Sequence, residues 1–172
     1  MLDPADTGPA CLSLCQDVQG ETFDYPEEFF KERIHNIRRP KPDDFQIKQA
    51  MEKIKKSKKP IIISGGGVFY SDAMDELGSF AIKHNIPVTQ TVMGYSTMKR
   101  DHSHFLGPIG GLGGRAANNL AKETDLAICV GTKLADFTTG SWANFENPEF
   151  KLVSINITRH DANKHLAEAV IG

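Results

Sequence analysis

The feature that most constrains the fold is an alternation of short β-branched runs with amphipathic stretches, which begins at residue 60. Residues 61–63 are all isoleucine, as expected for a strand that is buried on both faces of a parallel sheet. Three glycines at 65–67 follow the run, and a helix capped near Ser71 follows the glycines. Parallel strands need a crossover of this kind, so the pattern predicts a first strand–helix unit.

The same alternation continues to the end of the chain. Further strands are expected at 86–91, 126–130, 152–157 and 167–171, and helices are expected after Asp43 or Asp44 and near 115–122. A separate short strand is expected at 9–14. Strands that alternate with helices predict an α/β fold. We expect a Rossmann-like, doubly wound parallel sheet of about five or six strands with helices on both faces.

Composition places the chain among single globular domains. It has 172 residues, of which 40% are hydrophobic, and its three cysteines are too few for a disulfide scaffold. The net charge of −2 argues against a general nucleic-acid binder, and no apolar run is long enough for a membrane helix. Basic residues gather between Lys31 and Lys59, where a solvated linker and a helix end explain them. We therefore expect a cytoplasmic protein that binds neither nucleic acid nor membrane.

Three glycine-bearing loops follow expected strands or open a helix, at 65–67, 107–114 and 131–133. In open α/β sheets ligands bind at the carboxyl ends of the strands, and glycine lets the backbone approach a phosphate. Residues 111–116 match the pattern G-x-G-x-x-A, although no strand-like run leads directly into them. The loops indicate either a vestigial nucleotide site or tight turns and close packing. The candidate cofactor-binding residues are Gly65, Gly66, Gly67, Gly110, Gly111, Gly113, Arg115, Gly131, Thr132 and Lys133.

The remaining chemistry-bearing residues do not form a catalytic or metal-binding pattern. His102 and His104 lack further ligands at suitable spacing, so a solvated loop is the favoured interpretation. Cys11, Cys15 and Cys129 are interpreted as small buried hydrophobic residues. The polar segment from Asp136 to the single tryptophan at 142 is either a ligand or neighbour contact or a capped turn. We assign no catalytic and no metal-binding residue.

Several longer segments resemble the central domain of thiamine-diphosphate-dependent enzymes of the acetolactate synthase type. They are KKPIIISGGGV, NIPVTQTVMGYSTM, HSHFLGPIGGLGGRAANNLAKETDLAICVGTKLADF and KLVSINIT. The front segment GPACLSLCQDVQGE is similar to the last strand of that family's pyrimidine-binding domain. The resemblance implies three parts: the end of a pyrimidine-binding domain at 1–20, a linker at 21–42, and a central domain at 43–172 that is either complete or truncated at its C-terminus.

Enzymes of this family have three domains, and their activating glutamate and Gly-Asp-Gly metal motif lie outside the central one. This sequence contains no Gly-Asp dipeptide. The resemblance therefore implies a fragment that holds no complete cofactor site and is inactive alone. It implies thiamine diphosphate and magnesium for the parent enzyme, which is expected to be a homo-oligomer whose other domains are the partners of this one.

Within the family, YPEEFFKERIHNIRRP and DFTTGSW are similar to hydrolases of myo-inositol catabolism that open a cyclic trihydroxy-dione to a deoxyglucuronate. An assembly domain of such a hydrolase is the leading interpretation. The alternative is a regulatory domain that binds FAD or ADP. Flavin-binding relatives often carry an I-D-I-D pattern at the end of the fourth strand, where this chain has Asn156 and Thr158. We therefore do not expect bound FAD.

Overall fold

A computed structural model describes residues 2–172, so Met1, which the sequence-based domain assignment includes, lies outside the described part. The chain divides into two compact units, Met1–Arg39 and Pro40–Gly172. Within the first unit, two 3-10 turns, η1 (Val18–Gly20) and η2 (Glu27–Phe30), interrupt an otherwise irregular chain. The second unit contains the sheet and its helices.

The second unit is built on a six-stranded, all-parallel sheet in the order β3-β2-β1-β4-β5-β6. The strands are β1 (Pro60–Ser64), β2 (Val88–Gln90), β3 (Phe105–Pro108), β4 (Leu126–Val130), β5 (Lys151–Asn156) and β6 (Glu168–Ile171). This is the strand order of Rossmann-type sheets, in which the direction of adding successive strands across the sheet reverses between β1 and β4. The predicted fold is therefore confirmed, with six strands.

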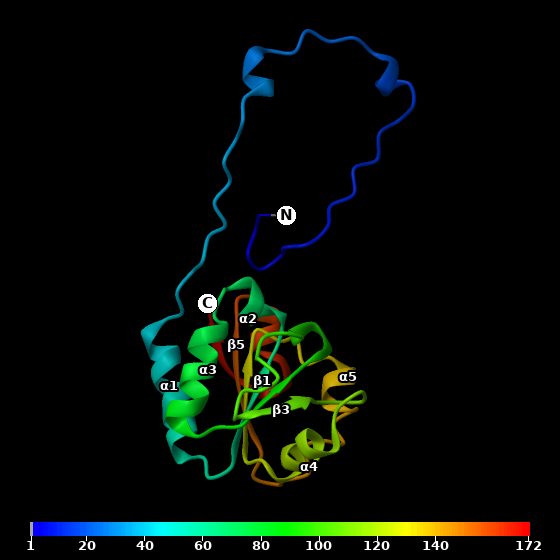
Figure 1. Ribbon diagram of the computed structural model, residues 1–172. Helices are drawn as coiled ribbons and strands as arrows, with labels where there is room; N and C mark the ends of the chain where they lie inside the picture. The colour runs from blue at the N-terminus through cyan, green and yellow to red at the C-terminus, as the bar shows by residue number, and fades with distance from the viewer. Residues whose placement is uncertain (1) are drawn as a thin grey trace. The chain divides into compact units, whose positions relative to one another are not determined.

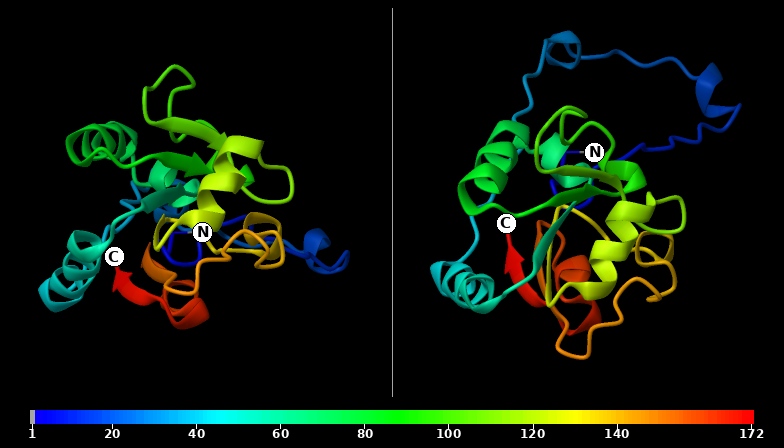
Figure 2. Two further views of the ribbon diagram at one scale, coloured as in Figure 1. Left: turned by 90° about the horizontal axis from the view of Figure 1, so that it is seen from below. Right: turned by 60° about the horizontal axis from the view of Figure 1, so that its bottom comes forward.

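Helices cover both faces of this sheet. The α-helices are α1 (Asp44–Lys56), α2 (Gly66–Tyr70), α3 (Met74–His84), α4 (Arg115–Glu123), α5 (Asp136–Thr139) and α6 (Arg159–Ala162), and the 3-10 turns are η3 (Val92–Gly94) and η4 (Lys164–Leu166). Figure 1 shows α1 and α3 on one side of the strands and α4 and α5 on the other. The two further views in Figure 2 show the same separation.

The side chains of successive strand residues alternate between two cores. Ile62 belongs to the core beneath α1 and α3, which also contains Ala50 and Ala81. Its neighbours at 61 and 63 belong to the opposite core, together with Ala117 of α4. All three isoleucines are at most 1% exposed, so β1 is buried on both faces, as its uninterrupted apolar run predicts.

Helix α1, near the start of the second unit, packs against the last strand, β6. The Asp43 side chain caps α1 by accepting a hydrogen bond from the Phe45 N–H at 2.8 Å, as expected for an aspartate in this position. Lys53 forms an ion pair with Glu168 of β6 at 3.0 Å. Gly172, after β6, packs against the backbone of Lys41 and Pro42.

One carboxylate joins the starts of the two central strands. Asp125, just before β4, accepts hydrogen bonds from the Ser57 hydroxyl and from the N–H groups of Lys58 and Lys59. Burial raises the pKa of Asp125, but these hydrogen bonds outweigh the burial and hold the pKa below its ordinary value. The side chain therefore stays ionised and holds the chain in position ahead of β1.

The loop before α4 contains a strand that the sequence analysis missed. β3 is only four residues long, lies at the edge of the sheet and contains a glycine and a proline, both of which are unfavourable in strands. An edge strand pairs on one side only and tolerates them. β3 leads directly toward the glycine-rich loop, so the expectation that no strand precedes this loop was wrong.

The region after β1 also differs from the expected single helix. α2 occupies 66–70 and ends at Ser71, and α3 begins at Met74 after Ala73. Ser71 therefore ends one helix rather than capping the next. Asp72 has a φ of +54°, a left-handed conformation that interrupts the helix and separates the two segments.

The expected strand at 9–14 is absent, because these residues have no partner strand within the described chain. Cys11 and Cys15 are exposed, which corrects the interpretation of both as buried residues, whereas Cys129 in β4 is fully buried as expected. Burial also raises the pKa of the Cys129 thiol, so this side chain is unsuited to act as a nucleophile. Among residues 2–172, no helix has the length and apolar character needed to span a membrane.

Candidate functional site

The strand order reverses between β1 and β4, and a ligand crevice is expected at the carboxyl ends of these two strands. Two of the predicted glycine loops meet at this point. The Gly67 N–H donates to the Gly131 carbonyl at 2.9 Å, and the Gly65 N–H donates to the Val130 carbonyl at 2.8 Å. A Cβ atom on Gly131 would come within 2.5 Å of the Gly67 Cα. The glycines thus allow two backbones to touch.

Thr132 lies in the same group, because a Cβ atom on Gly65 would come 2.6 Å from its side chain. The Thr132 carbonyl accepts a hydrogen bond from Asn156 Nδ2 at 3.0 Å. Asn156 also accepts from the Thr158 N–H at 2.9 Å, so its amide is used within the fold. Gly66 lies near the Met93 carbonyl, and Lys133 is exposed.

The other predicted loop, at 107–114, packs against α5 instead. The Gly111 N–H donates to the Phe137 carbonyl at 2.8 Å, and a Cβ atom on Gly110 would come 2.0 Å from that oxygen. The Asn118 amide binds both the N–H and the carbonyl of Gly110, at 2.9 and 3.0 Å. Gly113 donates to the Gly110 carbonyl, and Arg115 is exposed at the start of α4. The loop therefore has the strand–loop–helix context of a nucleotide-binding turn, but several of its N–H groups bind within the chain.

The polar residues outside the glycine loops are joined by local contacts. His104 lies within hydrogen-bond distance of Asn85 at 3.0 Å, and His102 Nδ1 accepts from the His104 N–H at 3.3 Å. The Ser141 hydroxyl donates to the Asp136 carboxylate at 3.2 Å, as expected for a capped turn. The Trp142 ring contacts the His165 ring, with centroids 4.3 Å apart.

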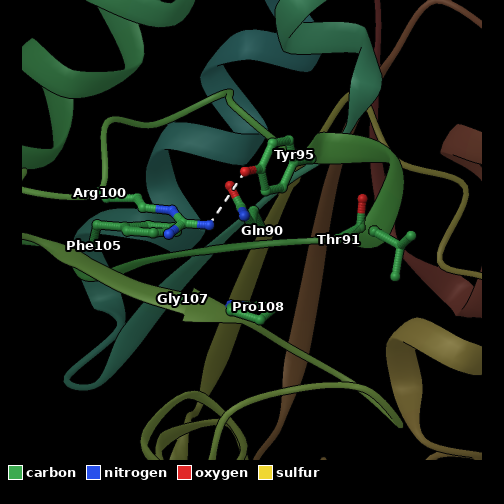
Figure 3. Close-up of a pocket in the computed structure, with 8 residues that line it drawn as sticks. Gln90, Thr91, Tyr95, Arg100, Phe105, Gly107 and Pro108 are labelled. Atoms are coloured by element: carbon green, nitrogen blue, oxygen red, sulfur yellow. Dashed lines mark hydrogen bonds between the residues drawn. The ribbon is translucent and has the colours of Figure 1, made fainter.

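A pocket that the sequence analysis missed lies beside the edge of the sheet, between the end of β2 and β3. Its volume is about 670 Å³, and Figure 3 shows Gln90, Thr91, Tyr95, Arg100, Phe105, Gly107 and Pro108 around it. The sequence does contain one signal for this pocket. Gln90 is the longest polar side chain of the expected strand at 86–91, and it is only 6% exposed in the structure.

Comparison with known proteins assigns the sheet-containing unit to a family. Residues 47–172 match the family described as thiamine pyrophosphate enzyme, central domain. The chain therefore belongs to the central-domain family of thiamine pyrophosphate enzymes. A solved structure of a Mycobacterium smegmatis protein, titled as a thiamin diphosphate-dependent enzyme, superposes with a TM-score of 0.60 at 20% identity over 80% of this chain and 27% of that one. This similarity supports the fold.

The curated relatives are more specific. The chain is 47% identical over all 172 residues to the 3D-(3,5/4)-trihydroxycyclohexane-1,2-dione hydrolase of Clostridium perfringens strain 13. It is 49% identical over 164 residues to the enzyme of the same name from Clostridium botulinum strain Eklund 17B, and 46% identical over 171 residues to hydrolase 1 of Bacillus cereus strain ZK. The sequence-based resemblance is thereby confirmed. The chain spans about 27% of the length of the Clostridium perfringens relative.

Proposed function

We propose that this chain acts as the central domain of a thiamine-diphosphate-dependent hydrolase that opens a cyclic trihydroxy-dione to a deoxyglucuronate. The observation that carries the proposal is the 47% identity to a named hydrolase, which runs through residues 1–46 as well as through the matched central domain. An alignment that covers both units favours a shared surface as well as a shared fold.

In this proposal the domain has an assembly role and no catalytic residue. Its partners are the other domains of a larger enzyme, which supply the thiamine diphosphate and magnesium sites and form a homo-oligomer in the cytoplasm. Residues 1–20 are the end of a pyrimidine-binding domain, 21–42 a linker and 43–172 the central domain. The boundary between the compact units, after Arg39, is consistent with the end of that linker.

A chimera tests the proposal. In the Clostridium perfringens hydrolase, the matching segment is replaced by this chain, and thiamine-diphosphate-dependent ring opening of the dione is measured. We expect activity within about tenfold of the parent, which corresponds to a change of about 1.4 kcal/mol in the activation free energy. The matched control carries the aligned segment of the Mycobacterium smegmatis protein, which shares the fold at 20% identity. We expect that control to lose activity.

An inactive chimera that keeps the parent's circular dichroism spectrum and assembly size would contradict the proposal. The isolated chain serves as a second control, and we expect it to show no ring opening with added cofactor. Ring opening by the isolated chain would contradict the assembly role.

A nucleotide-binding regulatory role is the second candidate. The Rossmann-type strand order and the β3–loop–α4 context favour it, and its residues are the ten candidate positions from Gly65 to Lys133. The internal hydrogen bonds of Gly67 and Gly111 weigh against it. Thermal unfolding with FAD and with ADP tests this role, because a ligand at 100 times its Kd stabilises the folded state by roughly 2.7 kcal/mol. No shift with either nucleotide would contradict it.

A further inference from the structure

The pocket between β2 and β3 contains a buried acceptor without a partner. The side-chain oxygen Oε1 of Gln90 is inaccessible to solvent, and it has no hydrogen-bond partner among residues 2–172. Such an atom destabilises the folded state, because its hydrogen bond to water is lost and not replaced. Gln90 also lines the pocket. A ligand that brings an O–H or N–H group to this oxygen would remove the cost.

The same pocket carries a positive charge without a carboxylate partner. Arg100 donates a hydrogen bond to the Tyr95 hydroxyl at 3.2 Å, and no ion pair involves Arg100 in the described part of the chain. A guanidinium group binds carboxylate and phosphate groups through several N–H donors. The Tyr95 oxygen accepts from Arg100, so its own O–H remains available as a further donor to an anion.

These groups lie on one side of the pocket. In Figure 3 the Gln90 amide, the Tyr95 hydroxyl and the Arg100 guanidinium gather at one end, and the rings of Tyr95 and Phe105 provide apolar faces. The pocket therefore offers a cation, a hydroxyl donor and an amide acceptor beside aromatic surface. Its volume of about 670 Å³ lies within the range of small-molecule sites.

Buried hydroxyl groups hold this arrangement in place. The Thr97 hydroxyl donates to the Gly94 carbonyl at 2.7 Å and lies 2.7 Å from the Ser64 hydroxyl at the end of β1. The Gly94 N–H donates to the Thr91 hydroxyl at 3.0 Å. Three buried polar side chains thus fix the turn η3, which carries Tyr95 to the pocket.

We propose that this pocket is a binding site for a small hydroxylated organic anion, such as a sugar acid. Arg100 and Tyr95 bind the anionic group, and Gln90 Oε1 accepts a hydrogen bond from a neighbouring hydroxyl. The recognised chemistry is an anionic head with hydroxyl groups beside it, and the head is either a carboxylate or a phosphate. The site shares Gly107 and Pro108 with the loop at 107–114, but none of the ten candidate nucleotide-binding residues lines it.

Titration calorimetry and amide NMR shifts of the full 172-residue chain test the site with four probes. D-glucuronate and D-glucose 6-phosphate carry the anionic head and the hydroxyls, and the stronger of the two identifies the head. Acetate lacks the hydroxyls and methyl glucoside lacks the charge. We expect one of the first two to bind at millimolar concentration with shifts around the pocket, and the latter two to bind at least about tenfold more weakly.

Two variants remove the two recognition groups separately. Arg100→Gln removes the charge, and Gln90→Leu removes the unpartnered acceptor while keeping a similar volume. We expect each to weaken the binding by roughly tenfold or more, because each variant removes one of the polar contacts to the ligand. Gln90→Leu is expected to leave the melting temperature unchanged or raised, because it removes an unsatisfied buried oxygen. Arg159→Gln, at an exposed arginine on α6, is the matched control and should bind as the parent does.

Absence of binding by both hydroxylated anions would overturn the proposal. Binding that survives both Arg100→Gln and Gln90→Leu would overturn it as well, because the ligand would then lie elsewhere. Neither measurement uses ring-opening activity, so the site and the proposed hydrolase role fail independently of each other.

Discussion

Single residues at the two ends of the central strands β1 and β4 perform different tasks. At the amino end, the Asp125 carboxylate satisfies backbone donors ahead of β1. At the carboxyl end, glycines allow the β1 and β4 loops to touch where any side chain would collide. The hydrogen bonds to Asp125 and the close approach at Gly131 thus position the two ends of the central strands.

Asp125→Asn tests the first task. We expect a loss of about 1–2 kcal/mol in the free energy of unfolding at neutral pH, because an amide accepts fewer of the three hydrogen bonds. The folded-state pKa of Asp125 lies below its unfolded value of about 3.9, so the ionised form stabilises the fold above that pH. The stabilisation is lost as the pH falls through the folded-state pKa.

Urea unfolding of both forms at neutral pH and near pH 3 measures these effects. The difference in free energy between parent and variant should shrink on acidification. Asp101→Asn, at an exposed position, serves as the control and should have little effect at either pH. An equal difference for Asp125→Asn at both pH values would contradict the assigned pKa shift.

Gly131→Ala tests the second task. Gly131 has a φ of +60°, and the added methyl group would come 2.5 Å from the Gly67 Cα. We expect a loss of roughly 2–4 kcal/mol, as strain and backbone displacement add together. Gly114→Ala, where the nearest atom is 4.0 Å away, should cost less than about 1 kcal/mol. Equal melting temperatures for the two variants would contradict the close approach.

At the scale of elements, the sequence predicted the helices and strands that a local residue pattern determines. It missed the strand that forms only by pairing with a neighbouring strand. The isoleucine run of β1 and the aspartates at 43 and 44 at the start of α1 were sufficient to identify both elements. β3 could not be recognised, because its four residues owe their conformation to β2. The pocket was missed for the same reason. Gln90 lies within the expected strand at 86–91, but Arg100 and Phe105 join it only after β3 has paired at the edge.

The turn η3 is the element that connects this edge to the centre of the sheet. Thr97→Val removes the hydroxyl that bonds to Gly94 and lies beside Ser64, and we expect a loss of about 1–3 kcal/mol because buried polar partners are left unsatisfied. Thr97→Ser keeps the hydroxyl and should retain most of the stability. Thermal unfolding of both variants measures the difference. A loss for Thr97→Ser as large as that for Thr97→Val would contradict the assigned role of the hydroxyl.

At the scale of the whole molecule, the two units differ in what stabilises them. Residues 2–39 include no buried side chain, and large apolar groups such as Leu12 and Ile34 are each 82% exposed. An exposed ring cluster around Tyr25 is the main side-chain contact of this unit. The hydrophobic effect, which requires burial, therefore stabilises the second unit and contributes little to the first.

Deletion of residues 2–39 tests this difference. We expect the melting temperature of the shortened chain to stay within about 2 °C of the parent, because a change of 1 kcal/mol shifts a domain of this size by roughly 2–4 °C or more. Differential scanning calorimetry compares the two proteins. A fall of more than about 5 °C would show that the first unit contributes to the stability of the second.

The contact of Gly172 with Lys41 and Pro42 has a mechanical consequence. Because the second unit begins and ends at one place, a force that stretches the chain through both ends loads α1 and β6 first. We expect the Lys53–Glu168 ion pair to break first, and β6 to separate from β5 after it. The central strands β1 and β4 bear load only after β6 has separated. The buried centre of the sheet therefore determines thermal stability, whereas contacts at the β6 edge determine resistance to a stretching force.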